Sequence, residues 1–257
     1  MKARSFHRLF SPSIMLWLKH ALPNAVTMLA MFFGLTGLLY ASQHAFSSAI
    51  ACVLISAVLD ACDGRVARAT GTSSKFGVEL DSLSDVVCFG AVPAFIMYSW
   101  GLESFGNLGW FACLTLAGAA ALRLARFNVA SSAHDRPSWM GHFFTGIPAP
   151  GGAFLALTPI YMMNAQILNA DASIRFAFYF LPVVAGLMVS NWPTFSAKAI
   201  SRKALRLLFV PTLLVAFATL IGLVIAPWLT LSLCSLAYLL SLPFSKLRFG
   251  VYARRNA

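Results

Sequence analysis

The chain has 257 residues, of which 59% are hydrophobic and only 11% are charged. With a mean hydropathy of +0.77, this composition excludes an ordinary water-soluble domain and is typical of a polytopic membrane protein. The formal net charge of +11 would suit nucleic acid, but the positions of the basic residues indicate a membrane topology instead. No nucleic-acid partner is therefore expected.

The first 21 residues form a basic, partly amphipathic segment. Because no small-residue cleavage site precedes the first apolar run, we expect this segment to be retained on the cytoplasmic membrane surface. Apolar runs of membrane-spanning length follow at about 22–42, 45–62, 85–101, 107–125, 144–165, 174–192, 207–226 and 228–245. The sequence thus predicts an all-α polytopic membrane protein with about eight spans.

The basic residues predict how these spans are oriented. Of the 19 lysines and arginines, only Arg175 falls on the opposite side of the predicted membrane from the others. Since positive charge is retained in the cytoplasm, this bias predicts a multi-pass protein of the cell (inner) membrane with both termini cytoplasmic. The lipid bilayer, with its anionic headgroups, is an expected partner.

The first span begins with the sequence LPNAVT at 22–27. Pro23 suits the first turn of a helix, and Asn24 and Thr27 are three residues apart, so their side chains share a helix face. The residues alone leave two interpretations open, a capping motif or the lining of a binding site.

Segment 60–85, DACDGRVARATGTSSKFGVELDSLSD, holds four of the six aspartates in a chain with only eight acidic residues. Asp60 and Asp63 are three residues apart, and Asp81 and Asp85 are four apart, so each pair shares one face of a helix. Four carboxylates in one pocket repel one another unless something compensates their charge. Divalent magnesium, manganese or calcium is the obvious compensation, because these ions prefer oxygen ligands.

Two glycines and an arginine on the same segment favour a phosphate-bearing substrate. Gly64 follows Asp63, and Gly77 lies one helical turn before Asp81. Glycine inside a helix costs about 1 kcal/mol relative to alanine, which suggests that a large group approaches the backbone there. Arg68 is suited to a phosphate, and together these residues indicate a diphosphate site. The alternative is an ion-paired helix end at the membrane surface.

The pattern DxxDGxxAR at 60–68, followed after eight residues by GxxxDxxxD at 77–85, resembles the complete signature of the CDP-alcohol phosphatidyltransferases. The resemblance implies a site with two divalent ions, Mg²⁺ or Mn²⁺. Asp60 and Asp81 would bridge both ions, and Asp63 would hold one. Asp85 would approach the other ion and act as the general base.

The resemblance also implies a donor substrate, CDP-diacylglycerol. The residues that it assigns to donor binding are Asn24, Thr27, Gly64, Arg68 and Ser74. CMP would be the leaving group. The resemblance covers about residues 20–200 and implies a six-helix core. We therefore expect a basic interfacial segment at 1–21, a catalytic core at 22–200, and a C-terminal transmembrane hairpin with a basic tail at 201–257. A homodimer is left open.

Further stretches resemble the phosphatidylserine synthase branch of the family: LDSLSDVVCFGAVPA (80–94), RLARFN (123–128), FTGIPAP (144–150) and SNWPTFSAK (190–198). This branch implies L-serine as the acceptor. A serine carboxylate needs a cation, and the candidates are Arg126, Arg123 and Lys198, which are otherwise ordinary positive-inside anchors. The alternative acceptors are glycerol 3-phosphate and an inositol species, which would also use basic residues.

A function of a different class, cation transport, would also place aspartates in a membrane. A transporter would need acidic or polar residues distributed through several spans. Here the acids gather at one predicted interface, and the fourth to eighth predicted spans contain none. The sequence therefore favours the transferase over the transporter.

Overall fold

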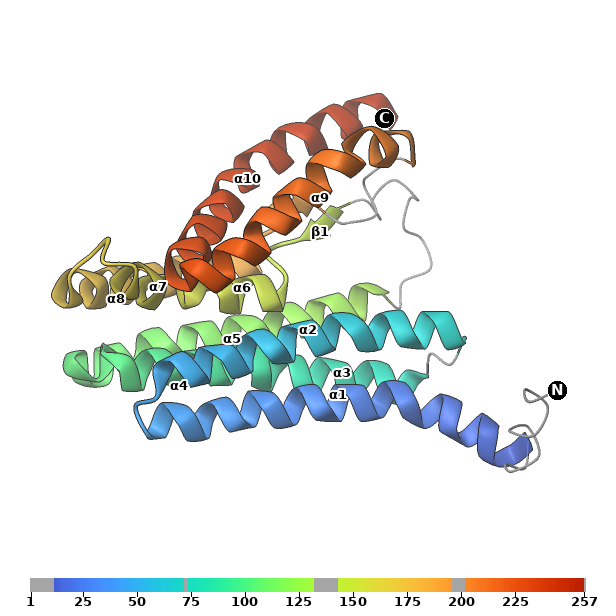
Figure 1. Ribbon diagram of the computed structural model, residues 1–257, viewed down its shortest axis with the longest axis horizontal. Helices are drawn as coiled ribbons and strands as arrows, with labels where there is room; N and C mark the ends of the chain where they lie inside the picture. Colours follow the sequence, from blue (N-terminus) through green and yellow to red (C-terminus); the bar gives the residue numbers. More distant parts are fainter. Residues whose placement is uncertain (1–11, 72–73, 132–142, 196–201, 257) are drawn as a thin grey trace. The chain divides into compact units, whose positions relative to one another are not determined.

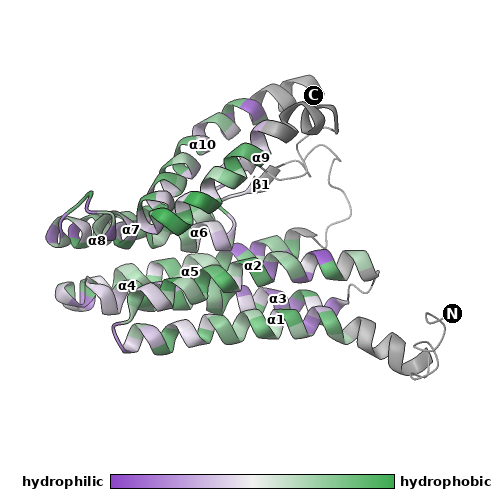
Figure 2. Ribbon diagram, viewed as in Figure 1, coloured by the Kyte–Doolittle hydropathy of each residue, from purple (hydrophilic) through white to green (hydrophobic). Residues whose placement is uncertain are grey.

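The computed structural model describes residues 12–71, 74–131, 143–195 and 202–256. The chain divides into two compact units, Met1–Ile96 and Met97–Ala257. Among the described residues the regular structure is helical except for one short two-stranded ribbon, which confirms the predicted all-α fold class. The helices are largely apolar, and Figure 2 shows hydrophilic residues gathered toward the end of α2 and along α3.

The first unit contains α1 (Pro12–Ser42), α2 (Phe46–Thr70), α3 (Lys75–Asp85), a π-helix η2 (Val86–Ala91) and the start of α4 (Val92–Trp100). In Figure 1, α1 and α2 lie side by side as a helical hairpin, and α1 also packs on α3 and η2. Small residues permit this close packing. A Cβ atom on Gly34 would lie 2.4 Å from the Cys88 sulfur, and one on Gly37 would lie 3.3 Å from the Ala49 carbonyl oxygen.

The chain passes from α3 into α4 through η2 without leaving the helical path. The amide of Val92 bonds to the carbonyl of Val87, five residues back rather than four. Pro93, the next residue, has no amide hydrogen, and its ring would clash with the carbonyl four residues earlier in a regular α-helix. The wider turn avoids this clash, and it begins directly after Asp85, the last residue of α3.

The elements of the second unit follow the rest of α4 in chain order: η3 (Leu102–Phe105), α5 (Gly106–Ser131), β1 (Phe143–Thr145), α6 (Ala149–Ala156), α7 (Thr158–Asn164), α8 (Ala170–Val189), β2 (Pro193–Phe195), α9 (Arg202–Ile225) and α10 (Pro227–Asn256). Helix α5 packs along α8, α7 packs on α10, and α9 and α10 form a hairpin around Ala226. Strands β1 and β2 are antiparallel, with Phe144 opposite Thr194.

Gly146 fixes how the segment after β1 meets the end of α8. Its φ angle is +76°, a conformation that glycine adopts without strain, and a Cβ atom there would lie 2.3 Å from the Met188 carbonyl oxygen. Its amide donates to the Trp192 carbonyl at 2.8 Å, and its carbonyl accepts from the Thr194 hydroxyl at 2.8 Å. The FTGIPAP and SNWPTF stretches are therefore joined backbone to backbone.

Six helices within the described ranges are long and apolar enough to cross a membrane: Ala21–Ser42, Phe46–Val66, Lys75–Trp100, Leu102–Val129, Ala170–Val189 and Pro227–Phe249. Each corresponds to one of the eight predicted spans. The seventh predicted span, 207–226, lies in α9, whose apolar stretch is shorter, Pro211–Ile225. The polytopic character of the chain is thus confirmed.

The fifth predicted span, 144–165, is wrong as a single helix. It consists of the end of β1 and two short helices, α6 with eight residues and α7 with seven, separated by Leu157. Pro159 has no amide hydrogen to donate to the Leu155 carbonyl, which interrupts the helix at this point. Both helices are much shorter than a membrane-spanning helix, which needs about 20 residues.

Candidate functional site

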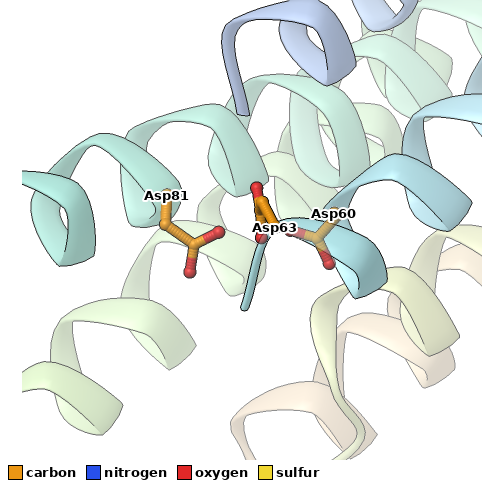
Figure 3. Close-up of side chains that lie close together, drawn as sticks. All are labelled: Asp60, Asp63 and Asp81. Atoms are coloured by element: carbon orange, nitrogen blue, oxygen red, sulfur yellow. The ribbon is translucent and has the colours of Figure 1, made fainter. Parts of the chain in front are cut away.

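Three aspartates from two helices converge in the first unit. Asp60 and Asp63 lie on the last part of α2, and Asp81 lies on α3. Each carboxylate offers an oxygen atom, and these three atoms all lie within 4.8 Å of one another. Figure 3 shows the three side chains pointing toward a common centre. Asp63 is buried, and the other two are half-buried.

Asp85 lies one helical turn further along α3 and is also buried, with 9% of its surface exposed. The carboxyl group of Asp60 lies within hydrogen-bonding reach of both Asp81 and Asp85. The structure therefore brings the four aspartates of the sequence pattern together, three as a tight group and Asp85 beside Asp60. The helical spacing explains this arrangement, because residues three and four apart lie on one face.

The residues present fit divalent metal ions. Three carboxylate oxygens this close would repel one another strongly, and their side chains are partly or fully enclosed. The donor set consists of oxygen only, which suits hard cations such as Mg²⁺ and Mn²⁺ and disfavours zinc, copper or iron–sulfur clusters. A cation that binds here removes the repulsion that the fold creates.

Thr27 contacts this cluster directly. Its hydroxyl donates a hydrogen bond of 2.6 Å to Oδ2 of Asp63, and the Thr27 side chain is only 5% exposed. The Pro23 carbonyl lies farther from the same hydroxyl, at 3.2 Å. A hydroxyl has one hydrogen to donate, and the shorter bond directs it to the carboxylate. The interpretation of Thr27 as part of the nucleotide lining stays a prediction, and the structure adds a positioning role for it.

Asn24, Ser74 and Gly77 lie together where α3 begins. The Ser74 hydroxyl oxygen accepts from the Gly77 amide at 3.0 Å and caps α3. A Cβ atom on Gly77 would lie 3.0 Å from the side-chain oxygen of Asn24 and 3.2 Å from the Ser74 hydroxyl oxygen. Glycine at position 77 therefore keeps the space between these two polar side chains open, and the Ser74 hydroxyl hydrogen stays free to donate.

The other predicted donor residues are only partly described. Gly64 follows Asp63 on α2 and is half-buried. Arg68 lies on α2, but its side chain is outside the described part of the structure. Lys198, one of the predicted acceptor residues, lies outside the described residues altogether. Their predicted roles stay predictions.

Arg126, on α5 of the second unit, has two neutral partners. One terminal nitrogen donates to the Val189 carbonyl and the other to the side-chain oxygen of Asn191. These contacts join α5 to the end of α8. Because both acceptors are neutral, the bonds orient the guanidinium group and leave its positive charge uncompensated by these two partners. The sequence predicts a site role for Arg126 but gives no such signal for Asn191, although Asn191 lies in the SNWPTF stretch.

Arg123, one turn earlier on α5 and half-buried, interacts electrostatically with Tyr238 of α10. The sequence gives no signal for Tyr238, which is one aromatic residue in an apolar helix. A second set of contacts joins α10 to the segment after α8. The indole nitrogen of Trp192 donates to the Leu242 carbonyl at 2.9 Å, and the Lys246 amine lies 4.3 Å from the Trp192 ring centre. Arg126 thus contacts the end of α8, Arg123 interacts with α10, and Trp192 joins the segment after α8 to α10.

Comparison with known proteins gives a consistent result. Residues 20–193 match a family model described as CDP-alcohol phosphatidyltransferase, and residues 208–243 match a second one, CDP-alcohol phosphatidyltransferase 2. A Mycobacterium bovis protein named CDP-diacylglycerol--serine O-phosphatidyltransferase is 34% identical over 228 residues, which cover 87% of this chain and 77% of that protein.

Relatives with the same name come from distant organisms. The Helicobacter pylori protein is 37% identical over 175 residues, 67% of this chain and 72% of its own length. The Methanocaldococcus jannaschii protein is 38% identical over 149 residues, 58% of this chain and 65% of its own length. The first family model spans the residues that carry the aspartate cluster, Asn24, Thr27 and both α5 arginines.

Proposed function

This chain belongs to the CDP-alcohol phosphatidyltransferase family, and from that premise we propose that it transfers the phosphatidyl group of CDP-diacylglycerol to the hydroxyl of L-serine. The products are phosphatidylserine and CMP. The convergence of three aspartates from α2 and α3, with Asp85 beside them, carries this proposal. The names of the relatives support serine as the acceptor.

The reaction requires a site that tolerates a diphosphate and activates a hydroxyl. Asp60, Asp63, Asp81 and Asp85 would hold two divalent ions, Mg²⁺ or Mn²⁺. When bound, these ions neutralise the diphosphate and the charge that develops on the transferred phosphoryl group. Thr27 keeps the Asp63 carboxylate oriented through its 2.6 Å hydrogen bond.

Donor binding uses the polar groups near the start of α3. Asn24 and Ser74 present an amide and a hydroxyl on either side of Gly77, and Gly64 and Arg68 complete the set that contacts CDP-diacylglycerol. Arg68 meets the phosphates as a charged donor. Ser74 both caps α3 and donates its own hydrogen to the donor.

Asp85 acts as the general base. It accepts the proton of the serine hydroxyl as the hydroxyl oxygen attacks the phosphorus atom of the phosphatidyl group. A new P–O bond to serine forms, and the P–O bond to CMP breaks, so that CMP leaves as the anion. Asp85 is buried and lies beside Asp60, and this shielding from bulk water supports its role as the base.

The acceptor carboxylate is bound by the basic residues of the second unit, of which Arg126 is the first candidate and Arg123 and Lys198 are the others. Arg126 supports this role because its two described partners are neutral. Its orientation is therefore set without a competing negative charge from those partners. A bidentate guanidinium suits the planar carboxylate of an amino acid.

We further propose that the aspartate site faces the cytoplasm in the inner membrane, with both termini on that side and residues 22–200 as the catalytic core. The charge bias of the lysines and arginines supports this orientation, and the match to residues 20–193 supports the extent of the core. Labelling of single cysteines introduced at Lys75 and Glu103 tests it. Equal access of an impermeant reagent to both positions from one side would refute it.

A headgroup screen tests the proposed reaction. The purified protein is given CDP-diacylglycerol and Mg²⁺ or Mn²⁺, with serine, glycerol 3-phosphate or inositol offered separately, and CMP and the lipid product are measured. We expect CMP release that depends on serine and yields phosphatidylserine. Transfer to one of the other acceptors, with none to serine, would overturn the choice of acceptor and leave the transfer chemistry intact.

A further inference from the structure

The hydroxyl group of Tyr238 has an unusual environment. Tyr238 lies on α10 in the second unit, and its hydroxyl oxygen is enclosed and has no hydrogen-bond partner among the described residues. Buried hydroxyl groups nearly always have a partner, which is protein, ordered water or ligand, because an unsatisfied one costs free energy. A phenylalanine would fill the same space without that cost. The hydroxyl therefore needs an explanation.

Helix α6 meets α10 at this hydroxyl, and α5 brings a positive charge near it. Arg123 of α5 lies close enough for its positive charge to act on Tyr238. Gly151 of α6 lies on another side, and a Cβ atom there would be 2.9 Å from the hydroxyl oxygen. The missing side chain at position 151 thus makes room for the phenol. A nearby cation attracts the hydroxyl oxygen. The hydroxyl hydrogen then points away from the cation and can be donated to a negatively charged acceptor.

Tyr161 provides an internal comparison. It lies on α7, is fully buried, and its hydroxyl oxygen also has no partner within the described residues. The two tyrosines differ in their surroundings, because no charged group of the described chain acts on the Tyr161 hydroxyl. An enclosed hydroxyl alone is therefore not a sign of a binding site in this protein. Of these two tyrosines, only Tyr238 combines an enclosed hydroxyl with a nearby arginine and a glycine that leaves room for the phenol.

We propose that the Tyr238 hydroxyl and the Arg123 guanidinium group together bind the carboxylate of the amino-acid acceptor. The arginine supplies the charge, and the phenol supplies a second donor to the same anion. This inference rests on the proposed function and extends it, because it gives α10 a residue that touches substrate. Arg126 lies three residues after Arg123, on the same side of α5, and belongs to the same basic face.

Tyr238→Phe is the decisive variant, since it removes one oxygen that has no partner in the described structure and should not impair folding. We expect the serine KM to rise about tenfold or more, as a lost hydrogen bond to a charged group predicts. The KM for CDP-diacylglycerol and the kcat at saturating serine should stay at their wild-type values. Tyr161→Phe is the matched control and should leave the serine KM unchanged.

A second readout does not depend on turnover. Serine should raise the melting temperature of the wild type and of Tyr161→Phe, and should do so in Tyr238→Phe only at correspondingly higher concentration. Gly151→Ala, which displaces the phenol rather than removing its oxygen, should behave like Tyr238→Phe. Serinamide, which lacks the carboxylate, should bind all the variants equally weakly.

The outcomes separate this inference from the proposed function. If the wild type transfers to serine and Tyr238→Phe keeps its serine KM while only its stability changes, the hydroxyl binds ordered water and the inference is wrong. A rise in the KM for CDP-diacylglycerol instead would assign the hydroxyl to a donor phosphate and would also overturn it. Failure of the wild type itself to use serine would refute the proposed function, a result that is visible before any variant is compared.

Discussion

The aspartate cluster of α2 and α3 and the arginine-bearing face of α5 handle charge in opposite ways. In the first, like charges converge, with three carboxylate oxygens within 4.8 Å of one another. In the second, cations contact neutral groups. Arg126 of α5 donates to a backbone carbonyl and an asparagine, and on α10 Lys246 likewise lies over the Trp192 ring.

This difference shows what each region can bind. Converging carboxylates repel one another and form a cluster that could hold a metal ion. A cation that is oriented by neutral acceptors keeps its charge available for an anionic ligand. The first region thus suits metal and phosphate chemistry, and the second suits recognition of a small anion. If this division holds, loss of metal should have the largest effect and loss of a neutral partner of Arg126 the smallest.

Removal of divalent metal should abolish activity completely. EDTA-treated protein should release no CMP from CDP-diacylglycerol, and Mg²⁺ or Mn²⁺ should restore the rate, because the carboxylates need divalent charge before an anionic diphosphate can approach. Metal should also raise the melting temperature of the wild type and not that of Asp81→Asn. Full activity in metal-free buffer would contradict the assignment of the cluster to metal binding.

Asp85→Asn should reduce kcat by about 10²–10⁴-fold, the usual contribution of general acid–base catalysis. Donor binding should be largely retained, because Asp85 lies at the edge of the three-oxygen group. Asp60→Asn is the comparison variant and should weaken metal and donor binding together. Equal losses of donor affinity in both variants would show that Asp85 is a structural member of the cluster rather than the base.

The aspartates could be predicted from sequence because their positions depend on local geometry. Spacings of three and four residues place side chains on one helix face wherever a helix forms. The contacts of the second region join residues far apart in the chain, such as Arg126 and Asn191, which are 65 positions apart. No periodicity encodes such a pair, so Asn191 and Tyr238 were found only in the structure.

The prolines likewise show that helix ends could not be predicted from the sequence alone. Pro159 interrupts the predicted fifth span, whereas Pro23, Pro182 and Pro243 lie inside continuous helices. Whether a proline ends a helix depends on how neighbouring segments compensate the lost hydrogen bond, and that information is not local. The close packing of Cys88 against Gly34 of α1 likewise joins residues far apart in the chain, which the sequence alone does not reveal.

Thr27→Val should raise the Mg²⁺ concentration needed for half-maximal activity about tenfold or more. The change removes a hydrogen bond to a buried carboxylate, which is worth about 1.5–3 kcal/mol, and keeps the shape of the side chain. Thr36→Val is a matched control on the same helix, because the Thr36 hydroxyl donates only to the Phe32 carbonyl. A normal metal requirement in Thr27→Val would limit Thr27 to contact with the nucleotide.

Arg126→Ala should raise the serine KM about tenfold or more, because it removes a charged donor to the carboxylate. The KM for CDP-diacylglycerol should change little. Arg175→Ala removes a cation from α8 on the opposite predicted side of the membrane and should leave both constants unchanged. If Arg126→Ala lowers only stability, Arg126 is a positive-inside anchor and joins α5 to α8 without touching serine.

Asn191→Ala should produce the smallest effect, a rise of a few-fold in the serine KM. Asn191 has no charge to offer the substrate, and its role is to orient one nitrogen of Arg126, while the Val189 carbonyl still holds the other. Loss of one such hydrogen bond is worth about 1 kcal/mol.

The double variant Arg126→Ala/Asn191→Ala tests whether Asn191 acts through Arg126. If Asn191 acts only through Arg126, the double variant should have the serine KM of Arg126→Ala alone, because no guanidinium group is left to orient. Additive effects would show instead that Asn191 contacts serine directly and that the recognition of the carboxylate extends beyond the arginines to the end of α8.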